Sequence, residues 1–175
     1  MSIYAFENKQ PTIGKGSFIY ESADVIGNVK LGKNCYIGPG ARIRGDYGTI
    51  TIGDNTAIEE NVVIHARPND ITVIGSHVTI GHAAIIHNAT INDWAVIGMG
   101  SIVSDWAEIG QWAVVAEGAV VKNKQKIPDK SIAVGIPAKI ISETSAEYEK
   151  QWTEFKNIYV DLARERLPNS LKKIK

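Results

Sequence analysis

Two of the four histidines in this 175-residue chain lie five positions apart, in the apolar segment IGHAAIIHNAT. Residues five positions apart do not share a face in either a helix or a strand, so neither element would present His82 and His87 together. Imidazole nitrogens bind zinc and related metals, and they also act as general bases. The two side chains are therefore either core histidines or ligands of something that the fold assembles.

The composition excludes several classes of function. Lys+Arg and Asp+Glu both number 19, so the charge balance favours neither a nucleic-acid nor an acidic-membrane partner. The start, MSIYAFENKQP, lacks the pattern of a signal peptide, and no apolar run reaches the length of a membrane span. Cys35 is alone, which excludes an intrachain disulfide or a cysteine metal cluster. We therefore expect a soluble, cytoplasmic protein.

An aliphatic residue recurs every six positions through most of the chain, and the residue four places later is usually small. The aliphatic series consists of Ile13, Ile19, Val25, Leu31, Ile37, Ile43, Ile52, Ile58, Ile64, Ile74, Ile80, Ile86, Ile91, Ile97, Val103, Ile109, Val115, Val121 and Ile127. A helix has no such period, whereas short strands joined by tight corners do. The pattern predicts a parallel β-helix with three sides and 18 residues in each coil, although periodicity does not indicate its hand.

Two interruptions and a change of character divide the chain. GDYGT near 45–49 and RPNDIT near 67–72 break the period, so we expect loops that bulge from the coil. IPDKSIAVGIPAK closes the solenoid, which we place at residues 1–141. Residues 142–175 then form a C-terminal amphipathic helix packed on the β-helix.

The helix is predicted from apolar residues in steps of four and three. They are Tyr148, Trp152, Phe155, Tyr159 and Leu162. Thr144 and Glu147 fit a capping box, and Pro168 should follow the end of the helix. The apolar stripe packs most simply on the β-helix of its own or a neighbouring subunit, and a short coiled coil is the alternative.

Stacking the coils locates the histidines. The third side of successive coils places His65 and His87 in the same position, one above the other, because the loop at 67–72 supplies the residues beyond 18. Arg44 falls directly below His65. Neighbouring coils are about 4.8 Å apart, so two stacked histidines can share one metal ion.

His82 belongs to the middle side of its coil, where its neighbour one coil earlier is Glu60, beside Glu59. We therefore expect it to point away from His65 and His87. A catalytic zinc takes a third protein ligand and keeps one open position. His82 of a neighbouring subunit could supply that ligand if three prisms close into a ring. This predicts a homotrimer with metal sites at its interfaces.

Two simpler interpretations stay open. HAAIIH could be an apolar subunit interface without a metal, and a single histidine is usually a surface or satisfied residue. His77 is one such candidate.

The segments ARIRGDYGTITIGDNTAIEENVVIHA, VTIGHAAIIHNATINDWAVIGMGSIV and VGIPAKII resemble the γ-class carbonic anhydrase-like proteins of the left-handed β-helix superfamily. The similarity is strongest to the branch found with phenylacetate-degradation and carnitine operons, and it covers nearly the whole chain. It implies a left-handed coil. VGIPAK alone is weak, because hexapeptide acyltransferases share it.

The resemblance also implies site residues. His65 and His87 would come from one subunit and His82 from the next, holding zinc, or alternatively iron or cobalt. Arg44 and Asp46 match an arginine–aspartate pair that bridges subunits, although a surface role for Arg44 is the simpler alternative.

Further positions match the family with changes. Glu59 and Glu60 replace a glutamine and an aspartate beside the ligands, and Glu59 could orient a metal-bound hydroxide or simply be a solvated interface carboxylate. Tyr159 is a third candidate catalytic residue, although packing is the simpler role for it. Tyr47 replaces a glutamate, and the long acidic loop that carries a proton-shuttle glutamate is here only RPNDI.

The resemblance implies a lyase in which metal-bound hydroxide attacks CO2 to give bicarbonate. Three alternatives remain: a metal-dependent acyl-CoA thioesterase, a hexapeptide-repeat acetyltransferase with one histidine as base, and a scaffold trimer with a vestigial site. For each of the three enzymatic functions the substrate is a small molecule or acyl thioester, and we expect neither nucleic acid nor membrane as a partner.

Overall fold

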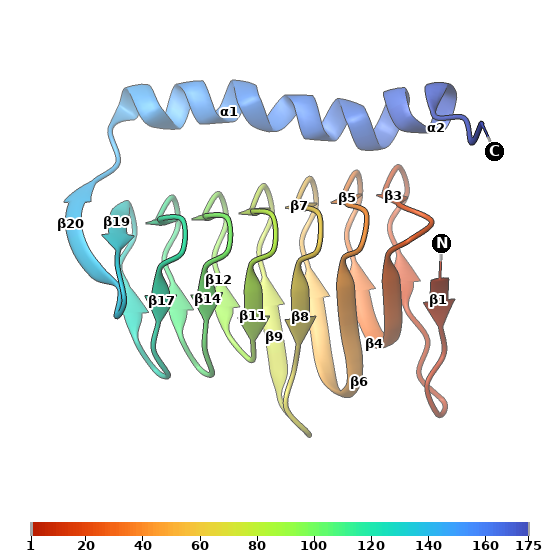
Figure 1. The fold of residues 1–175 in the computed structure, drawn as a ribbon, viewed down its shortest axis with the longest axis horizontal. Coiled ribbons are helices and arrows are strands. Elements are labelled where there is room, and N and C mark those ends of the chain that lie inside the picture. Colours follow the sequence, from red (N-terminus) through yellow and green to blue (C-terminus); the bar gives the residue numbers. More distant parts are fainter. Residues whose placement is uncertain (1, 175) are drawn as a thin grey trace.

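The computed structural model describes residues 2–174 and is a parallel β-solenoid of about seven turns with a helix alongside it (Figure 1). The prediction of a left-handed parallel β-helix is confirmed. The strands form two sheets. The order of strands in one sheet is β17 (Val120–Val121), β14 (Ile102–Val103), β11 (Ile85–His87), β8 (Val63–His65), β6 (Arg42–Ile52), β9 (Ile71–Ile74), β12 (Thr90–Ile91), β15 (Glu108–Ile109) and β18 (Lys126–Ile127). In the same sheet β4 (Asp24–Leu31) pairs with β6, and β1 (Ser2–Tyr4) and β2 (Thr12–Ile13) pair with β4. The other runs β20 (Lys139–Glu143), β19 (Ser131–Val134), β16 (Val114–Val115), β13 (Val96–Ile97), β10 (Thr79–Ile80), β7 (Ala57–Ile58), β5 (Tyr36–Ile37) and β3 (Phe18–Ile19).

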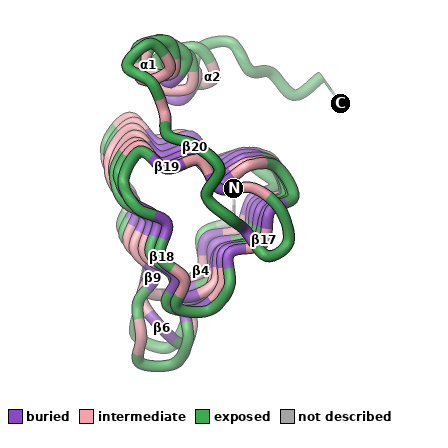
Figure 2. The backbone as a smooth tube through the Cα atoms, turned by 90° about the vertical axis from the view of Figure 1, so that its left-hand side faces the viewer, coloured by how far each residue is buried: buried purple, intermediate pink, exposed green. Residues whose placement is uncertain are grey.

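The core is the stack of inward-facing aliphatic residues that the six-residue period predicts. All of them are buried except Ile13, which lies in the first coil, where no full coil covers it. Small residues such as Cys35, Ala41 and Ala84 are fully buried beside them. Figure 2 shows these buried segments at the same place in successive coils. Burial of a continuous aliphatic column gives a solenoid its stability, because each coil completes the core of the next.

The register between coils agrees with the predicted stacking. Val25 pairs with Ile43, and the next coils continue through Ile64 and Ile86 to Val103. All strand pairs are parallel except the last, β19 with β20, where the chain reverses and the parallel stack ends.

The two interruptions differ from each other. The loop predicted at 67–72 is present but shorter: residues 66–70 connect β8 and β9, whereas Ile71 and Thr72 already belong to β9. Residues 45–49 were expected to be a loop but form extended backbone within β6, which pairs with β4 on both sides of a register shift. The extra residues therefore make a bulge in a continuous strand. Both segments lie on the edge of the solenoid away from the helix (Figure 1).

The cap of the C-terminal helix lies one residue later than predicted, and the helical segment continues past its predicted end. Helix α1 (Ala146–Asp161) is capped by Ser145, whose hydroxyl accepts from the Tyr148 N–H at 3.1 Å. Thr144 instead donates its hydroxyl to Lys130 O, so the predicted capping box is wrong. A π-helical turn η1 (Leu162–Arg166) and helix α2 (Leu167–Ser170) follow without a break, so Pro168 lies within the helical segment, directly after the π-helical turn, rather than beyond its end. Among residues 2–174, no helix combines the length and apolar character that a bilayer span requires.

Helix α1 packs along the second sheet of its own chain (Figure 2), with a face that is shifted from the predicted stripe but still half-buries Tyr148, Trp152 and Tyr159. Lys156 and Ala163 are each 1% exposed, whereas Phe155 is 44% exposed. The Lys156 ammonium donates to Val78 O and Thr79 Oγ1, and burial lowers its pKa to about 7. The helix is therefore rotated so that a lysine reaches the solenoid backbone and an aromatic residue stays outside.

Candidate metal centre

His65 at the end of β8 and His87 at the end of β11 are register partners, with Arg44 of β6 in the coil below. This is the stacking that the sequence predicts. The facing nitrogens, His65 Nδ1 and His87 Nε2, are 3.2 Å apart. Parallel pairing of adjacent coils thus turns two residues 22 positions apart into a pair of imidazoles on one outer surface.

Two carboxylates fix which ring nitrogens carry protons. Asp46 Oδ1 lies 3.0 Å from His65 Nε2, and Asp105 Oδ1 lies 2.5 Å from His87 Nδ1. Burial raises the pKa of Asp46, but hydrogen bonds from His65 and the Tyr47 N–H, together with the charges of Arg44 and His65, lower it overall. Since an ionised carboxylate only accepts, each histidine donates through that nitrogen. The lone pairs of the other two nitrogens, His65 Nδ1 and His87 Nε2, are left facing each other.

The facing lone pairs fit a shared cation. Without a proton or a metal ion between them, two imidazole lone pairs at 3.2 Å repel each other. Two imidazole nitrogens bound to one tetrahedral zinc at ordinary bond lengths would be about 3.3 Å apart. His65 and His87 therefore have the donor type and the separation that a zinc-like ion requires.

Asp105 and its partner Arg67 are residues that sequence reasoning missed. Asp105 is 7% exposed and forms two hydrogen bonds with the Arg67 guanidinium, at 2.9 and 2.7 Å. Those bonds lower its pKa, against burial, which raises it. Asp105 follows His87 by 18 residues, one coil, so a search of the next coil for carboxylates beside each histidine could have found it.

Arg44 and Asp46 form an ion pair within the chain, at 3.0 Å, and the Arg44 side chain is half exposed. The predicted bridge between subunits stays a prediction, because one chain is described. Arg44, His65 and His87 line a shallow hollow of about 460 Å³ together with Val63 and Arg42. In the single chain the pair is therefore only partly exposed, with the His65 side chain at 15% and the His87 side chain at 36%.

His82 lies at the corner after β10, where its neighbours are the predicted Glu59 and Glu60. Its Nε2 is 3.1 Å from Glu59 Oε2 and its Nδ1 is 2.5 Å from Glu60 Oε2. Glu59 is 5% exposed and also accepts from the His82 backbone N–H. Carboxylates occupy both ring nitrogens, so His82 can bind a metal only after one of these contacts is released.

Tyr159 reaches this corner from helix α1, so the structure brings it to Glu59. Burial and a hydrogen bond to Glu59 raise the pKa of Tyr159, which keeps its hydroxyl protonated. The Tyr36 hydroxyl donates to Glu60 at 2.6 Å. A pocket of about 230 Å³ lies between the helix and this corner, lined by Glu59, His82 and apolar side chains that include Trp152, Phe155 and Met99.

The predicted site residues thus form two half-sites. The first holds Arg44, Asp46, His65 and His87. The second holds Glu59, Glu60, His82 and Tyr159. Within residues 2–174 of one chain, no three potential ligands gather in a metal-binding group. A complete three-histidine site would require a second chain.

His77 takes part in neither half-site. It stacks on Trp94 with ring centroids 4.1 Å apart, and Trp94 stacks on Trp112 at 4.7 Å. Asn55 Nδ2 donates to its Nε2 from the coil below, and burial lowers its pKa. All four residues have positive φ at the same corner of successive coils. His77 therefore fits a structural corner ladder.

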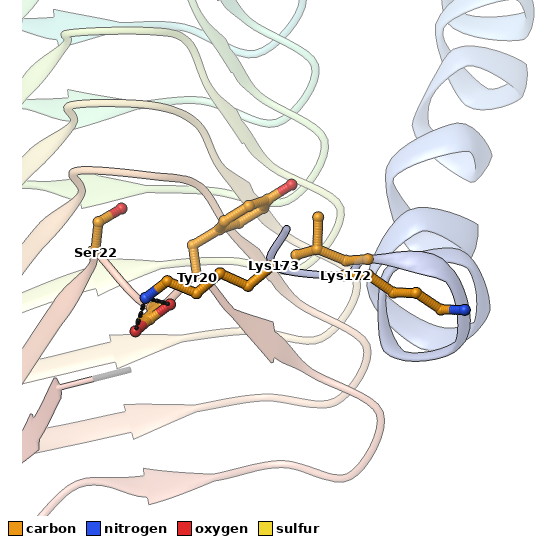
Figure 3. A pocket seen from close by; sticks show the side chains of 6 residues that line it. Tyr20, Ser22, Lys172 and Lys173 are labelled. Carbon is orange, nitrogen blue, oxygen red and sulfur yellow. Dashed lines mark hydrogen bonds and ion pairs between the residues drawn. The ribbon is translucent and has the colours of Figure 1, made fainter. Parts of the chain in front are cut away.

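A larger hollow, of about 700 Å³, lies far from the histidines. It is bounded by the first coil, at Tyr20 and Ser22, and by Lys172 and Lys173 after helix α2 (Figure 3). Lys173 is ion-paired there with Glu21 at 3.2 Å, and both side chains are mostly exposed. Its lining lacks the convergent histidines and buried carboxylates of the two half-sites.

Comparison with known proteins agrees with the solenoid fold and shows the family. The family described as "Bacterial transferase hexapeptide (six repeats)" matches residues 10–45. The carnitine operon protein CaiE of Escherichia coli is 35% identical over 152 residues, covering 87% of this chain and 77% of that protein. Gamma carbonic anhydrase 2, mitochondrial, of Arabidopsis thaliana is 35% identical over 163 residues, or 90% of this chain. The chain belongs to the γ-carbonic anhydrase-like family of hexapeptide-repeat proteins.

The family contains more than one activity by name. The chain spans 59% of the length of the Arabidopsis protein, which is therefore the longer of the two. Among solved structures, a putative acetyltransferase of Bacillus cereus superposes with a TM-score of 0.91 at 35% identity, over 93% of this chain and 95% of that one. The names of these relatives therefore include a carbonic anhydrase and a putative acetyltransferase, and the chemistry of this chain has to be argued from the site.

Proposed function

We propose that this protein is a metal-dependent enzyme of the carbonic anhydrase type, which hydrates CO2 reversibly to bicarbonate. The observation that carries the proposal is the pair of facing lone pairs on His65 Nδ1 and His87 Nε2, 3.2 Å apart and set by two carboxylates. A hydrogen-bonded histidine pair would need only one bare nitrogen and a shared proton, whereas a zinc-type cation uses the lone pairs of both nitrogens.

The proposed metal takes its third protein ligand, His82, from a neighbouring subunit of a trimer. Exposed apolar residues flank both half-sites: Val63, Ile85 and Ile102 are 36–41% exposed and in register beside the histidine pair, and Met99 is 50% exposed one coil from His82. Covering such surfaces is favourable. Hexapeptide-repeat and γ-carbonic anhydrase-type proteins are generally trimers, which supports this arrangement.

The metal, when bound, would supply a Lewis acid that brings the pKa of water to about 7. In this proposal the side chains of the protein accept the proton that the water loses and carry it away from the site. Glu59 is the buried acceptor beside His82, and Tyr159 donates to Glu59 and restricts its carboxylate. Glu60, held by Tyr36 and His82, is the next acceptor outward. Together they would replace the acidic loop that is only RPNDI in this chain.

A second candidate, acyl-CoA hydrolysis or acyl transfer, is favoured by one observation. The pocket beside His82 has a volume of about 230 Å³ and is lined by Trp152, Phe155 and Met99. It has more apolar room than CO2 requires and would accommodate a small acyl group. The name of the Bacillus cereus relative, a putative acetyltransferase, points the same way.

Metal analysis of the purified protein tests the site. We expect about one zinc, iron or cobalt ion per chain when the protein is prepared without oxygen, together with CO2 hydration above background. His82→Ala should lose both, because the third ligand is missing. His77→Asn is the matched control, since Asn55 already occupies the equivalent ladder position. A wild-type protein that neither contains nor takes up metal would refute the proposed function, and acyl-CoA hydrolysis that exceeds CO2 hydration would favour the second candidate.

A further inference from the structure

We propose that Asp105 and Arg67 are positioning residues that hold His87 in the tautomer and orientation needed to bind the metal. The inference rests on the proposed function and deepens it, because these two residues lie outside the three-histidine pattern. It assigns a role to the loop at 66–70, which shapes the site although it carries no acidic shuttle.

Asp105 is placed to act on His87 and on no other histidine among the described residues. Its Oδ1 lies 2.5 Å from His87 Nδ1, and its side chain is 10% exposed. A buried carboxylate accepts a hydrogen bond from a protonated ring nitrogen. It therefore excludes the alternative tautomer, in which a lone pair on Nδ1 would face the carboxylate. Nε2 of His87 is therefore left bare on the side that faces His65.

Arg67 in turn fixes the carboxylate. Its Nε donates to Asp105 Oδ1 at 2.9 Å and its Nη2 donates to Oδ2 at 2.7 Å. A paired guanidinium holds a carboxylate in a single plane, which one donor cannot do. Asp105 Oδ1 is thus shared between Arg67 and His87, and any rotation of the carboxylate would break both contacts.

The loop that carries Arg67 is itself anchored to the coils above. The Arg67 N–H donates to Asn88 Oδ1 at 3.1 Å, and Asn88 Nδ2 donates to Asp70 Oδ2 at 2.8 Å. Trp106 Nε1 donates to the same Asp70 oxygen at 2.9 Å, and the Arg67 guanidinium lies 5.3 Å from the centre of the Trp106 ring. The position of Arg67 is therefore determined by a closed network that ends at His87.

This network mirrors the contact on the other histidine. Asp46 accepts from His65 Nε2 on one side of the pair, and Asp105 accepts from His87 Nδ1 on the other. By binding the N–H of its histidine, each carboxylate leaves the other ring nitrogen unprotonated and facing the neighbouring ring. Loss of the Asp105 contact should therefore impair the pair even though both histidines remain.

The test measures zinc affinity of the full-length protein by competition with a chelator. Asp105→Asn replaces one acceptor oxygen with an NH2 group, which opposes either Arg67 or the His87 N–H. We expect the dissociation constant for zinc to rise by about 10–100-fold. Arg67→Met should give a smaller rise, and because the Arg67 side chain is 46% exposed this variant should fold. Asp129→Asn is the control, since Asp129 accepts a backbone N–H far from the histidines.

A second readout distinguishes positioning from structural support. In protein with ¹⁵N-labelled histidine, the NMR spectrum of the metal-free wild type should show His87 as the Nδ1–H tautomer, and Asp105→Asn should shift it toward Nε2–H at an unchanged melting temperature. An unchanged tautomer, or a zinc dissociation constant within twofold of the wild type, would overturn the inference. If the wild type binds no zinc, the proposed function fails, and the tautomer alone then decides whether Asp105 positions His87.

Discussion

Glu59 differs from the surface carboxylates of this chain because it is buried and hydrogen-bonded while it borders the proposed site. It is 5% exposed, contacts His82 through both the backbone N–H and Nε2, and receives a hydrogen bond from Tyr159. Such a carboxylate can accept a proton at a fixed place. The neighbouring Glu60 is more exposed and is bound to Tyr36.

We predict that Glu59→Gln lowers kcat for CO2 hydration by about 10²-fold or more, because an amide cannot accept the proton that the water loses. Stopped-flow assays on metal-loaded protein measure it, and the metal content should stay at the wild-type level. Glu108→Gln, at an exposed carboxylate paired with Lys126, is the control. Unchanged kcat in Glu59→Gln would leave Glu59 as a structural carboxylate.

Helix α1 was predicted correctly as an element, but its packed face is centred on Lys156, which the predicted stripe did not include. Its docking on the second sheet depends on Lys156, whose ammonium is buried against Val78 O and Thr79 Oγ1. Burial lowers the Lys156 pKa from 10.5 to about 7, and the charges of Glu59 and Cys35 oppose that effect. Between these two values the unfolded chain binds more protons than the folded one, so stability increases as pH rises through this range.

We therefore predict that the free energy of unfolding rises between pH 7 and pH 10, by an amount on the order of a few kcal/mol. Lys156→Met should remove most of this increase, because no buried ammonium remains to lose its proton. Denaturant unfolding at several pH values measures the effect. Lys150→Met, at an exposed position of the same helix, should keep the wild-type slope, and a wild-type slope in Lys156→Met would refute the explanation.

The whole molecule separates the two half-sites, and each half-site contains a part of the proposed metal centre that the other lacks. One side of the solenoid carries His65 and His87, and a corner elsewhere on the coil carries His82. A site divided in this way can be complemented between chains, which a site within one chain cannot.

We predict that His82→Ala and His65→Ala chains, each inactive alone, regain activity when unfolded and refolded together. With random mixing into trimers, about a quarter of the sites combine an intact His65–His87 pair with an intact His82. CO2 hydration and bound metal should therefore recover to about a quarter of the wild-type level. Mixing the folded proteins without unfolding is the control, and no recovery after refolding would argue against a site shared between chains.

The sequence by itself determined the coil, its register and the histidine pair. Each aliphatic residue in the six-residue period packs only on its neighbours in adjacent coils, so the stacking of His87 on His65 above Arg44 follows from counting. Only the tertiary structure decided the contacts of the loop and helix side chains. The contact of Arg67 with Asp105, the extended bulge at 45–49 and the rotation that buries Lys156 depend on how loop and helix side chains meet a finished surface. Those contacts have no period, because they form once, between segments whose separation in the chain does not repeat.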